Sequence, residues 1–145
     1  MRNGHILLVE DNEGDILLTQ EAFEHSSLVA SLSIVRNGKD AIDFLIKQGK
    51  FADKASPDFV LLDVNIPKKN GHEVLKFIKN NDAIKHIPVV MFTTSSTPKD
   101  IAMAYQNNAN CYITKPVDVS SFQTVINQIE SFWLSTVQLS KPQNA

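Results

Sequence analysis

Phe59-Val60-Leu61-Leu62, an apolar run that ends on Asp63, decides the fold. Its length and branching are typical of a fully buried strand in a parallel sheet. A second run of the same kind, residues 6–9, ends on Glu10 and Asp11. In open α/β sheets, ligands bind at the rim formed by the carboxyl ends of the strands. We therefore expect carboxylates to converge at one rim, where they repel one another unless a cation or a chemical change relieves the repulsion.

Three further apolar runs predict strands, and helical periodicity follows each of the five. The runs lie at 32–35, 88–92 and 112–114; the helical patterns lie at about 15–25, 41–48, 74–78, 97–107 and 120–139. Thr97 and Pro98 read as the cap and first residue of the fourth helix. Five strand–helix units with short connections predict an α/β fold with a parallel sheet, right-handed crossovers and helices on both faces. We expect one domain, residues 1–139, and a disordered tail, 140–145.

The last helix is expected to be unusually long. From Ser120 to Leu139 it would measure ~30 Å at 1.5 Å per residue, enough to overhang a domain of this size. Phe132 and Trp133 lie near its end. Because large aromatic side chains anchor interfaces, we predict that both belong to a protein–protein surface. The alternative is that they cap the core of their own domain.

Composition narrows the class of protein. The chain has 145 residues, 43% hydrophobic and 21% charged, which are values of a globular domain. A net charge of −2 gives no reason to expect a nucleic acid or an anionic membrane as partner. No run approaches the ~20 apolar residues of a membrane span, and the N-terminus lacks the pattern of a signal peptide. With its single cysteine suited to a reducing compartment, the chain is expected to be cytoplasmic.

Polar side chains end four of the five predicted strands and would meet at the rim. They are Glu10 and Asp11, then Asp63, then Thr93 and Thr94, then Lys115. Each alone suits a helix cap, a turn or a solvated position. Together, the carboxylates and the backbone carbonyl of Asn65 make a hard oxygen site for Mg²⁺. Asp63 can act as nucleophile toward a phosphoryl group, whose oxygens Thr93 and Lys115 can bond.

Four separated motifs resemble the receiver domain of two-component response regulators. They are Val9-Glu10-Asp11-Asn12, Leu62-Asp63-Val64-Asn65-Ile66-Pro67 with Gly71, Thr93-Thr94, and Tyr112-Ile113-Thr114-Lys115-Pro116. The resemblance covers about residues 5–133. It implies a flavodoxin-like, doubly wound sheet of order 2-1-3-4-5. It also implies a signalling protein that takes a phosphoryl group from a histidine kinase onto Asp63 and loses it slowly by itself.

The same resemblance implies roles for the other residues at the rim. Glu10, Asp11, Asp63 and Asn65 would hold Mg²⁺, and Thr93 and Lys115 would contact the phosphoryl group. Thr93 and Tyr112 match the family's switch, in which a new dianion draws the hydroxyl inward and lets the aromatic ring rotate in. The bond between Lys115 and Pro116 is expected to be cis.

Four segments along the chain, including its end, are similar to a subfamily of single-domain regulators that partner phytochrome-type histidine kinases. The similar segments are Glu13-Gly14-Asp15-Ile16, residues 50–57, residues 109–118 and Ile129-Glu130-Ser131-Phe132-Trp133-Leu134. This resemblance implies a homodimer through the face made of the fourth helix, the fifth strand and the fifth helix. It also implies a light-sensing kinase as partner.

Four other readings of the sequence compete with a phosphorylated receiver. A flavin mononucleotide carrier would need a phosphate loop where Glu10 and Asp11 stand. A phosphatase of the haloacid-dehalogenase kind would need a second acidic residue at position 65, where this chain has Asn65. A calcium-binding EF-hand loop would need oxygen ligands at positions 67 and 74, where this chain has Pro67 and Val74. The fourth is a degenerate receiver that acts as a phosphorylation-independent interaction module; the intact set of rim residues argues against it.

Overall fold

The two apolar runs that end on carboxylates are neighbours in the middle of one parallel sheet. A computed structural model describes residues 4–24 and 26–136. Strand β1 (Gly4–Val9) pairs with β3 (Phe59–Leu62), and Val9 lies opposite Leu62. This register brings the residues that follow, Glu10 and Asp63, to the same edge of the sheet. Leu62 is fully buried, as are its neighbours along β3, and each such side chain stabilises the fold by about 1.5–3 kcal/mol.

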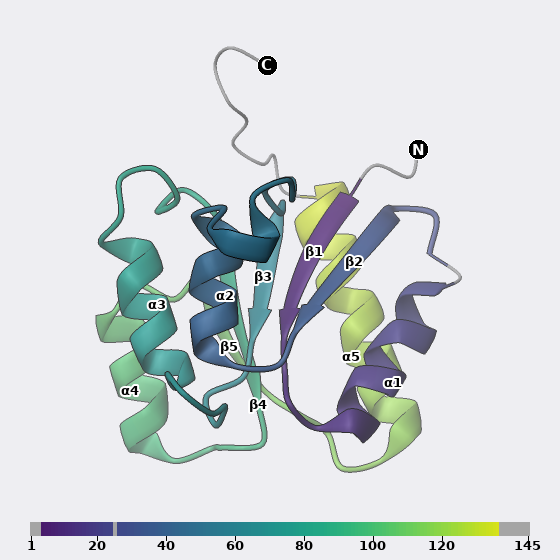
Figure 1. Cartoon of the computed structure of the whole chain (residues 1–145). Helices are drawn as coiled ribbons and strands as arrows, with labels where there is room; N and C mark the ends of the chain where they lie inside the picture. Colours follow the sequence, from purple (N-terminus) through teal and green to yellow (C-terminus); the bar gives the residue numbers. More distant parts are fainter. Residues whose placement is uncertain (1–3, 25, 137–145) are drawn as a thin grey trace.

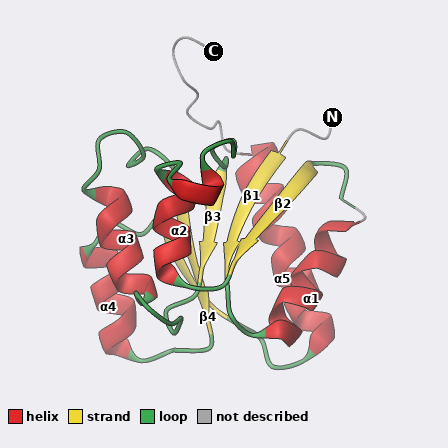
Figure 2. Cartoon of the chain, in the orientation of Figure 1, coloured by secondary structure: helices red, strands yellow, loops and turns green. Residues whose placement is uncertain are grey.

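The sheet has five parallel strands in the order β2-β1-β3-β4-β5, which confirms the flavodoxin-like, doubly wound fold (Figures 1 and 2). The other strands are β2 (Val29–Val35), β4 (Val89–Thr93) and β5 (Cys111–Thr114). The helices are α1 (Glu13–Glu24), α2 (Gly38–Leu45), α3 (Gly71–Lys79), α4 (Pro98–Gln106) and α5 (Val119–Ser131). None of the helices within 4–24 and 26–136 is long and apolar enough to cross a membrane.

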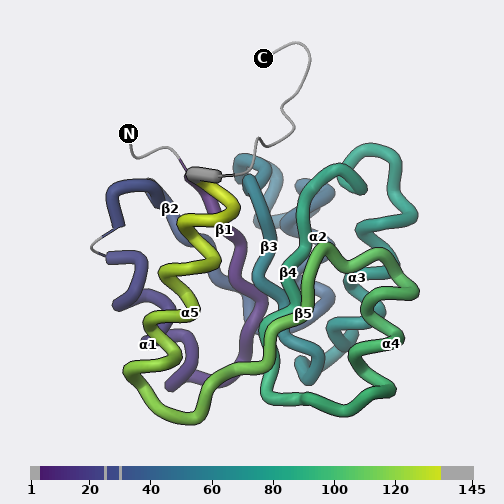
Figure 3. The backbone as a smooth tube through the Cα atoms, turned by 180° about the vertical axis from the view of Figure 1, so that it is seen from behind, coloured from purple at the N-terminus to yellow at the C-terminus, as the bar shows by residue number. Residues whose placement is uncertain are grey.

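The helices cover the sheet as two separate layers, each with its own core. Helices α2, α3 and α4 pack on one face through side chains such as Phe44, Leu75 and Ala104. Helices α1 and α5 pack together on the other face (Figure 3). Phe23 and Ile126 are buried there. Because both faces of the central strands are covered, those strands are apolar throughout, as their sequence predicts.

Side-chain caps set where four of the helices begin. Asn37, Asn70, Thr97 and Asp118 each accept a hydrogen bond from the backbone N–H three residues later. The cap at Thr97 with Pro98 after it confirms the predicted start of α4. Helix α2 begins at Gly38 rather than near residue 41, because Asn37 satisfies the N–H of Asp40.

The last helix is extended beyond α5, but not as a continuous α-helix. The α-helical part ends at Ser131 and a π-helical segment, Phe132–Thr136, follows. The remaining predicted residues, 137–139, and the predicted tail, 140–145, lie outside the described residues. Trp133 packs on the core, with its ring 6.3 Å from that of Phe59, whereas Phe132 is 52% exposed. The two aromatic residues therefore have different surroundings.

The expected cis bond before Pro116 is wrong. Throughout the described part of the chain every peptide bond is trans, including the bond between Lys115 and Pro116. Trans is the intrinsically preferred isomer of a bond before proline, by about 0.5–1 kcal/mol.

Gly71 fits where no larger residue can, at the start of α3 against the loop that carries Asp63. A Cβ atom added to Gly71 would overlap the backbone carbonyl of Asp63 and come within 2.8 Å of the Cα atom of Val64. We expect Gly71→Ala to lower the free energy of unfolding by about 1–3 kcal/mol, as overpacking does, in urea denaturation.

Gly14 offers a matched control for this substitution. It lies in α1, where an added Cβ would meet only the side chain of Asn12, at 3.3 Å. Because alanine favours helix, Gly14→Ala should leave stability unchanged or raise it by up to about 1 kcal/mol. Equal losses in both variants would contradict the close packing at Gly71.

Candidate phosphoacceptor site

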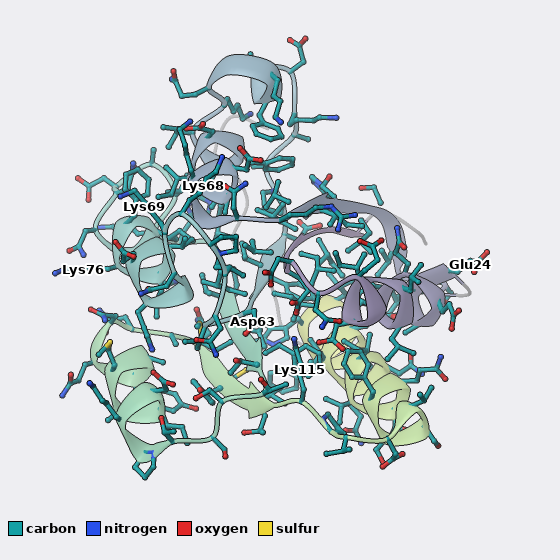
Figure 4. The ribbon with its side chains drawn as sticks, turned by 60° about the horizontal axis from the view of Figure 1, so that its bottom comes forward. Glu24, Asp63, Lys68, Lys69, Lys76 and Lys115 are labelled. Atoms are coloured by element: carbon teal, nitrogen blue, oxygen red, sulfur yellow. The ribbon has the colours of Figure 1, made fainter. Side chains whose placement is uncertain are left out.

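Four side chains from four strand ends meet at the carboxyl edge of the sheet, the lower edge in Figure 1. Glu10 follows β1, Asp63 follows β3, Thr93 ends β4 and Lys115 follows β5. Figure 4 shows Asp63 and Lys115 side by side between the two helical layers. All four residues are buried, with exposures of 2%, 7%, 0% and 7% in that order. Buried polar side chains are stable only where they have partners, so their contacts define the site.

Lys115 is the centre of this site. Its Nζ donates hydrogen bonds to Oε1 of Glu10, to Oδ2 of Asp15 at 2.8 Å and to Oδ2 of Asp63 at 3.0 Å. An ammonium group has three hydrogens, so all its donors are engaged by carboxylates. We name Lys115, Glu10, Asp15 and Asp63 the lysine cluster. One ammonium there faces three carboxyl groups, and two of them, Glu10 and Asp63, are among those that the sequence predicts to converge.

Asp15 is a member of this cluster that the sequence reasoning did not predict. It stands in the first turn of α1, and Asn12 fixes that turn by accepting the N–H of Asp15 at 2.9 Å. The prediction considered only residues directly after strands. No spacing from the strand-end acids points to Asp15, because Asp11 precedes α1 and only the tertiary fold brings the carboxylate of Asp15 to Lys115.

Burial and charge shift the pKa values of the cluster. Burial raises the pKa of Glu10 to about 7, although the hydrogen bond and charge of Lys115 oppose the rise. Burial by itself would lower the pKa of Lys115, but its bonds to Asp15 and Glu10 and the charge of Asp63 raise that pKa above its ordinary value. Lys115 is therefore charged at any physiological pH, whereas Glu10 titrates near neutrality.

The two other predicted metal ligands lie at the margin of the cluster. Asp11 and Asn65 are exposed, and the backbone N–H of Asn65 donates to Oδ1 of Asp63 at 3.3 Å. Among the residues that the structure describes, no group of three or more His, Cys, Asp or Glu side chains is arranged to hold a metal ion. Glu10, Asp11, Asp63 and the Asn65 carbonyl have the hard oxygen donors that suit Mg²⁺, so their chemistry fits this ion. In the structure described here, the cation between Glu10 and Asp63 is Lys115.

The two predicted switch residues meet through a third residue, Ser95. Thr93 is fully buried, and its Oγ1 accepts the backbone N–H of Ser95 at 3.3 Å. Tyr112 is half-buried and donates its hydroxyl to the carbonyl of Ser95 at 2.8 Å. Burial raises the pKa of Tyr112, so its hydroxyl stays protonated and can donate. Thr94, by contrast, is exposed.

The arrangement surrounds the Asp63 carboxylate, a group that can act as a nucleophile, with groups that stabilise negative charge. One oxygen of Asp63 contacts the Lys115 ammonium, and the other accepts the N–H of Asn65. The hydroxyl of Thr93 lies at the end of the adjacent strand β4, which pairs with β3. Fixed positive charge and hydrogen-bond donors near a carboxylate stabilise the negative charge that develops during phosphoryl transfer.

Comparison with known proteins identifies the family. Residues 6–127 match the model of the response regulator receiver domain. The chain belongs to this receiver family. Among its curated relatives, the response regulator Rcp1 of Synechocystis sp. is 44% identical over 134 residues, which are 92% of this chain and 91% of Rcp1. The probable methanogenesis regulatory protein FilR2 of Methanothrix harundinacea is 38% identical over 130 residues, 89% of this chain and 83% of FilR2.

Solved structures agree with this receiver assignment. The phosphorylated cyanobacterial phytochrome response regulator RcpA superposes with a TM-score of 0.93 at 43% identity, covering 96% of this chain and 99% of that one. The Mn²⁺-bound form of the response regulator Rcp1 superposes with a TM-score of 0.92 at 42% identity, covering 96% and 100%. The receiver fold and its family are thereby confirmed along almost the whole chain.

Proposed function

We propose that this receiver acts as a cytoplasmic phosphoacceptor regulator, with Asp63 taking a phosphoryl group from a histidine kinase. The observation that carries the proposal is the contact between the buried Asp63 carboxylate and the Lys115 ammonium at 3.0 Å, at the rim of a receiver sheet. The solved structure of phosphorylated RcpA, which is 43% identical to this chain, supports it.

In the proposed reaction, a carboxylate oxygen of Asp63 attacks the phosphorus of a phosphohistidine. The bond between phosphorus and the imidazole nitrogen breaks, and its electron pair returns to the imidazole. Lys115 stays beside the carboxylate and stabilises the negative oxygens, while Thr93 offers a hydroxyl donor from the adjacent strand. Slow loss of the phosphoryl group to water then resets the protein.

A divalent cation would be held by Glu10, Asp11, Asp63 and the backbone carbonyl of Asn65. When bound, Mg²⁺ neutralises charge on the transferred group and relieves the repulsion among the carboxylates. The Mn²⁺-bound form of Rcp1 supports a divalent ion in this family. Burial raises the pKa of Glu10, and a bound cation would oppose this rise because it favours the ionised carboxylate.

The partner we propose is a phytochrome-type histidine kinase, and the signalling surface is the α4-β5-α5 face. The names of RcpA and of the bacteriophytochrome response regulator AtBRR, which is 32% identical to this chain, support the kinase class. Phosphorylation of Asp63 would move Thr93 and Tyr112 and so change this face, through which we propose a homodimer. Phe132, 52% exposed, is available to such an interface, and Trp133 would contribute from its half-buried position.

Phosphorylation by a small donor tests this proposal without the kinase. We expect wild-type protein incubated with acetyl phosphate and Mg²⁺ to gain the mass of one phosphoryl group, measured by intact-protein mass spectrometry. Omission of Mg²⁺ should greatly reduce the gain. An unmodified protein under the complete conditions would favour a phosphorylation-independent interaction module instead.

A further inference from the structure

Ser95, in the loop between β4 and α4, makes a hydrogen bond to a different element with each of its polar groups. Its backbone N–H donates to Thr93 and its carbonyl accepts from Tyr112, as described above. Its hydroxyl donates to Oδ2 of Asp100, in the first turn of α4. A displacement of Ser95 is therefore transmitted to β4, β5 and α4 together.

Asp100 extends this connection to α3. Its second carboxylate oxygen, Oδ1, lies 2.9 Å from Nε2 of His72. Because a carboxylate only accepts hydrogen bonds, Nε2 carries the hydrogen and donates it. His72 is only 8% exposed, and its other nitrogen, Nδ1, is buried without a hydrogen-bond partner in the described part of the chain. Within the described part of the chain, the contact with Asp100 is thus the one hydrogen bond of this buried imidazole. Its loss would leave both ring nitrogens buried without a partner, which is energetically costly.

His72, the last residue in this series of contacts, lies close to the phosphoacceptor in the sequence and in space. His72 directly follows Gly71, whose N–H donates to the carbonyl of Val64 at 2.8 Å and which packs against the backbone of Asp63. Bonds from Ser95 and His72 hold the pKa of Asp100 below its ordinary value, so its carboxylate is ionised at neutral pH and bonds strongly to both. Helix α4 is therefore connected both to the loop between β4 and α4 and to the loop that carries Asp63.

We propose that Asp100 is a positioning residue that couples α4 to the phosphoacceptor site through Ser95 on one side and His72 on the other. The inference rests on the proposed phosphorylation of Asp63. When a phosphoryl group draws Thr93 inward, Ser95 moves with it, and Asp100 carries that movement into the first turn of α4. His72 holds the other oxygen of Asp100 fixed relative to α3, so the displacement rotates α4 instead of loosening it. Without the carboxylate, Asp63 is still phosphorylated but α4 responds less.

The test compares hydrogen exchange in residues 98–106 and 111–114 before and after phosphorylation by acetyl phosphate and Mg²⁺. In wild type, we expect phosphorylation to change exchange in both segments. In Asp100→Ala, the extent of phosphorylation by intact mass should match wild type, while most of the phosphorylation-induced change in 98–106 is lost. Comparing the two states of each variant separates coupling from a purely structural effect, which alters exchange in both states equally.

Asp82→Ala is the matched control, since Asp82 is an exposed acid whose partner is Lys85. It should behave as wild type. If Asp100→Ala does not fold, Ser95→Ala decides the question, because it removes only the hydroxyl bond to Asp100 and should also weaken the response of α4. Phosphorylated variants with an undiminished α4 response would overturn the coupling alone. Failure of wild type to gain a phosphoryl group would overturn the proposed function, and the coupling with it.

Discussion

The Asp63→Asn variant is expected to take up no phosphoryl group from acetyl phosphate and Mg²⁺, while folding at least as stably as wild type. The amide is not a nucleophile, so the acceptor is lost. The substitution also removes one of the three carboxylates that bind Lys115. The negative charge of Asp63 helps to raise the pKa of Glu10, and this repulsion is lost in the variant. We expect the free energy of unfolding to rise by about 1 kcal/mol, the equivalent of about one pKa unit of relieved repulsion.

Intact mass and urea denaturation measure the two parts of this prediction. Asp82→Asn is the control, because Asp82 has a side chain that is 94% exposed and lies outside the lysine cluster. It should be phosphorylated as wild type is. A phosphorylated Asp63→Asn protein would show that another residue is the acceptor. A large loss of stability would show instead that Asp63 stabilises the fold, contrary to the repulsion inferred for the cluster.

The Lys115→Ala variant is expected to lose both stability and phosphorylation. Removing the ammonium leaves Glu10 and Asp63 buried beside Asp15 without their cation. Breaking a buried pair from one side costs about 3–5 kcal/mol in other proteins, and we expect a loss of about 3 kcal/mol at pH 8 in urea denaturation. Phosphorylation should slow by about a hundredfold or more, the usual effect of losing one group that stabilises a developing negative charge.

The destabilisation of Lys115→Ala should depend on pH with a definite sign. The pKa of Glu10 is raised by burial to about 7, so the folded protein binds the proton of Glu10 more tightly than the unfolded chain does. In wild type, the cost of ionising Glu10 is therefore absent below about pH 4.5 and complete above about pH 7. The hydrogen bond and charge of Lys115 oppose the rise of this pKa, so the pKa of Glu10 lies still higher in the variant and the cost keeps growing there above pH 7. The deficit of the variant relative to wild type should therefore grow as the pH rises above about 7. Lys85→Ala, on an exposed lysine, should show neither effect, and a deficit independent of pH would argue against the carboxylates as its cause.

The central strands could be predicted from the sequence because they depend on residues that are neighbours in the chain. The four consecutive apolar residues of β3 have the length and branching that favour a strand covered on both faces. The end of the last helix could not be predicted in the same way. Apolar spacing beyond Ser131 looks the same in an α-helix and in the wider π-helical turn that Phe132 begins. Packing of Trp133 against Phe59, a contact distant in sequence, accompanies that turn.

The site could be predicted where its residues directly follow strands. Glu10, Asp63 and Lys115 do so, and the structure brings them together. Asp15 joins them from a helix, which a search limited to strand ends misses. His72 and Asp100 were missed for a related reason: both stand in first helical turns, where a polar residue is usually a capping residue. Only the tertiary packing of α3 beside α4 shows that they contact each other.

Chemical mapping of the phosphoryl group tests the phosphoacceptor assignment most directly. Borohydride reduces an acyl phosphate to an alcohol, so an aspartyl phosphate is converted into homoserine, which peptide mass spectrometry locates. After treatment with acetyl phosphate and Mg²⁺ and then with borohydride, we predict homoserine at position 63 and at no other acidic residue. Homoserine at Asp11 or Asp15 with Asp63 unchanged, or a phosphoryl group that borohydride does not remove, would contradict Asp63 as the phosphoacceptor.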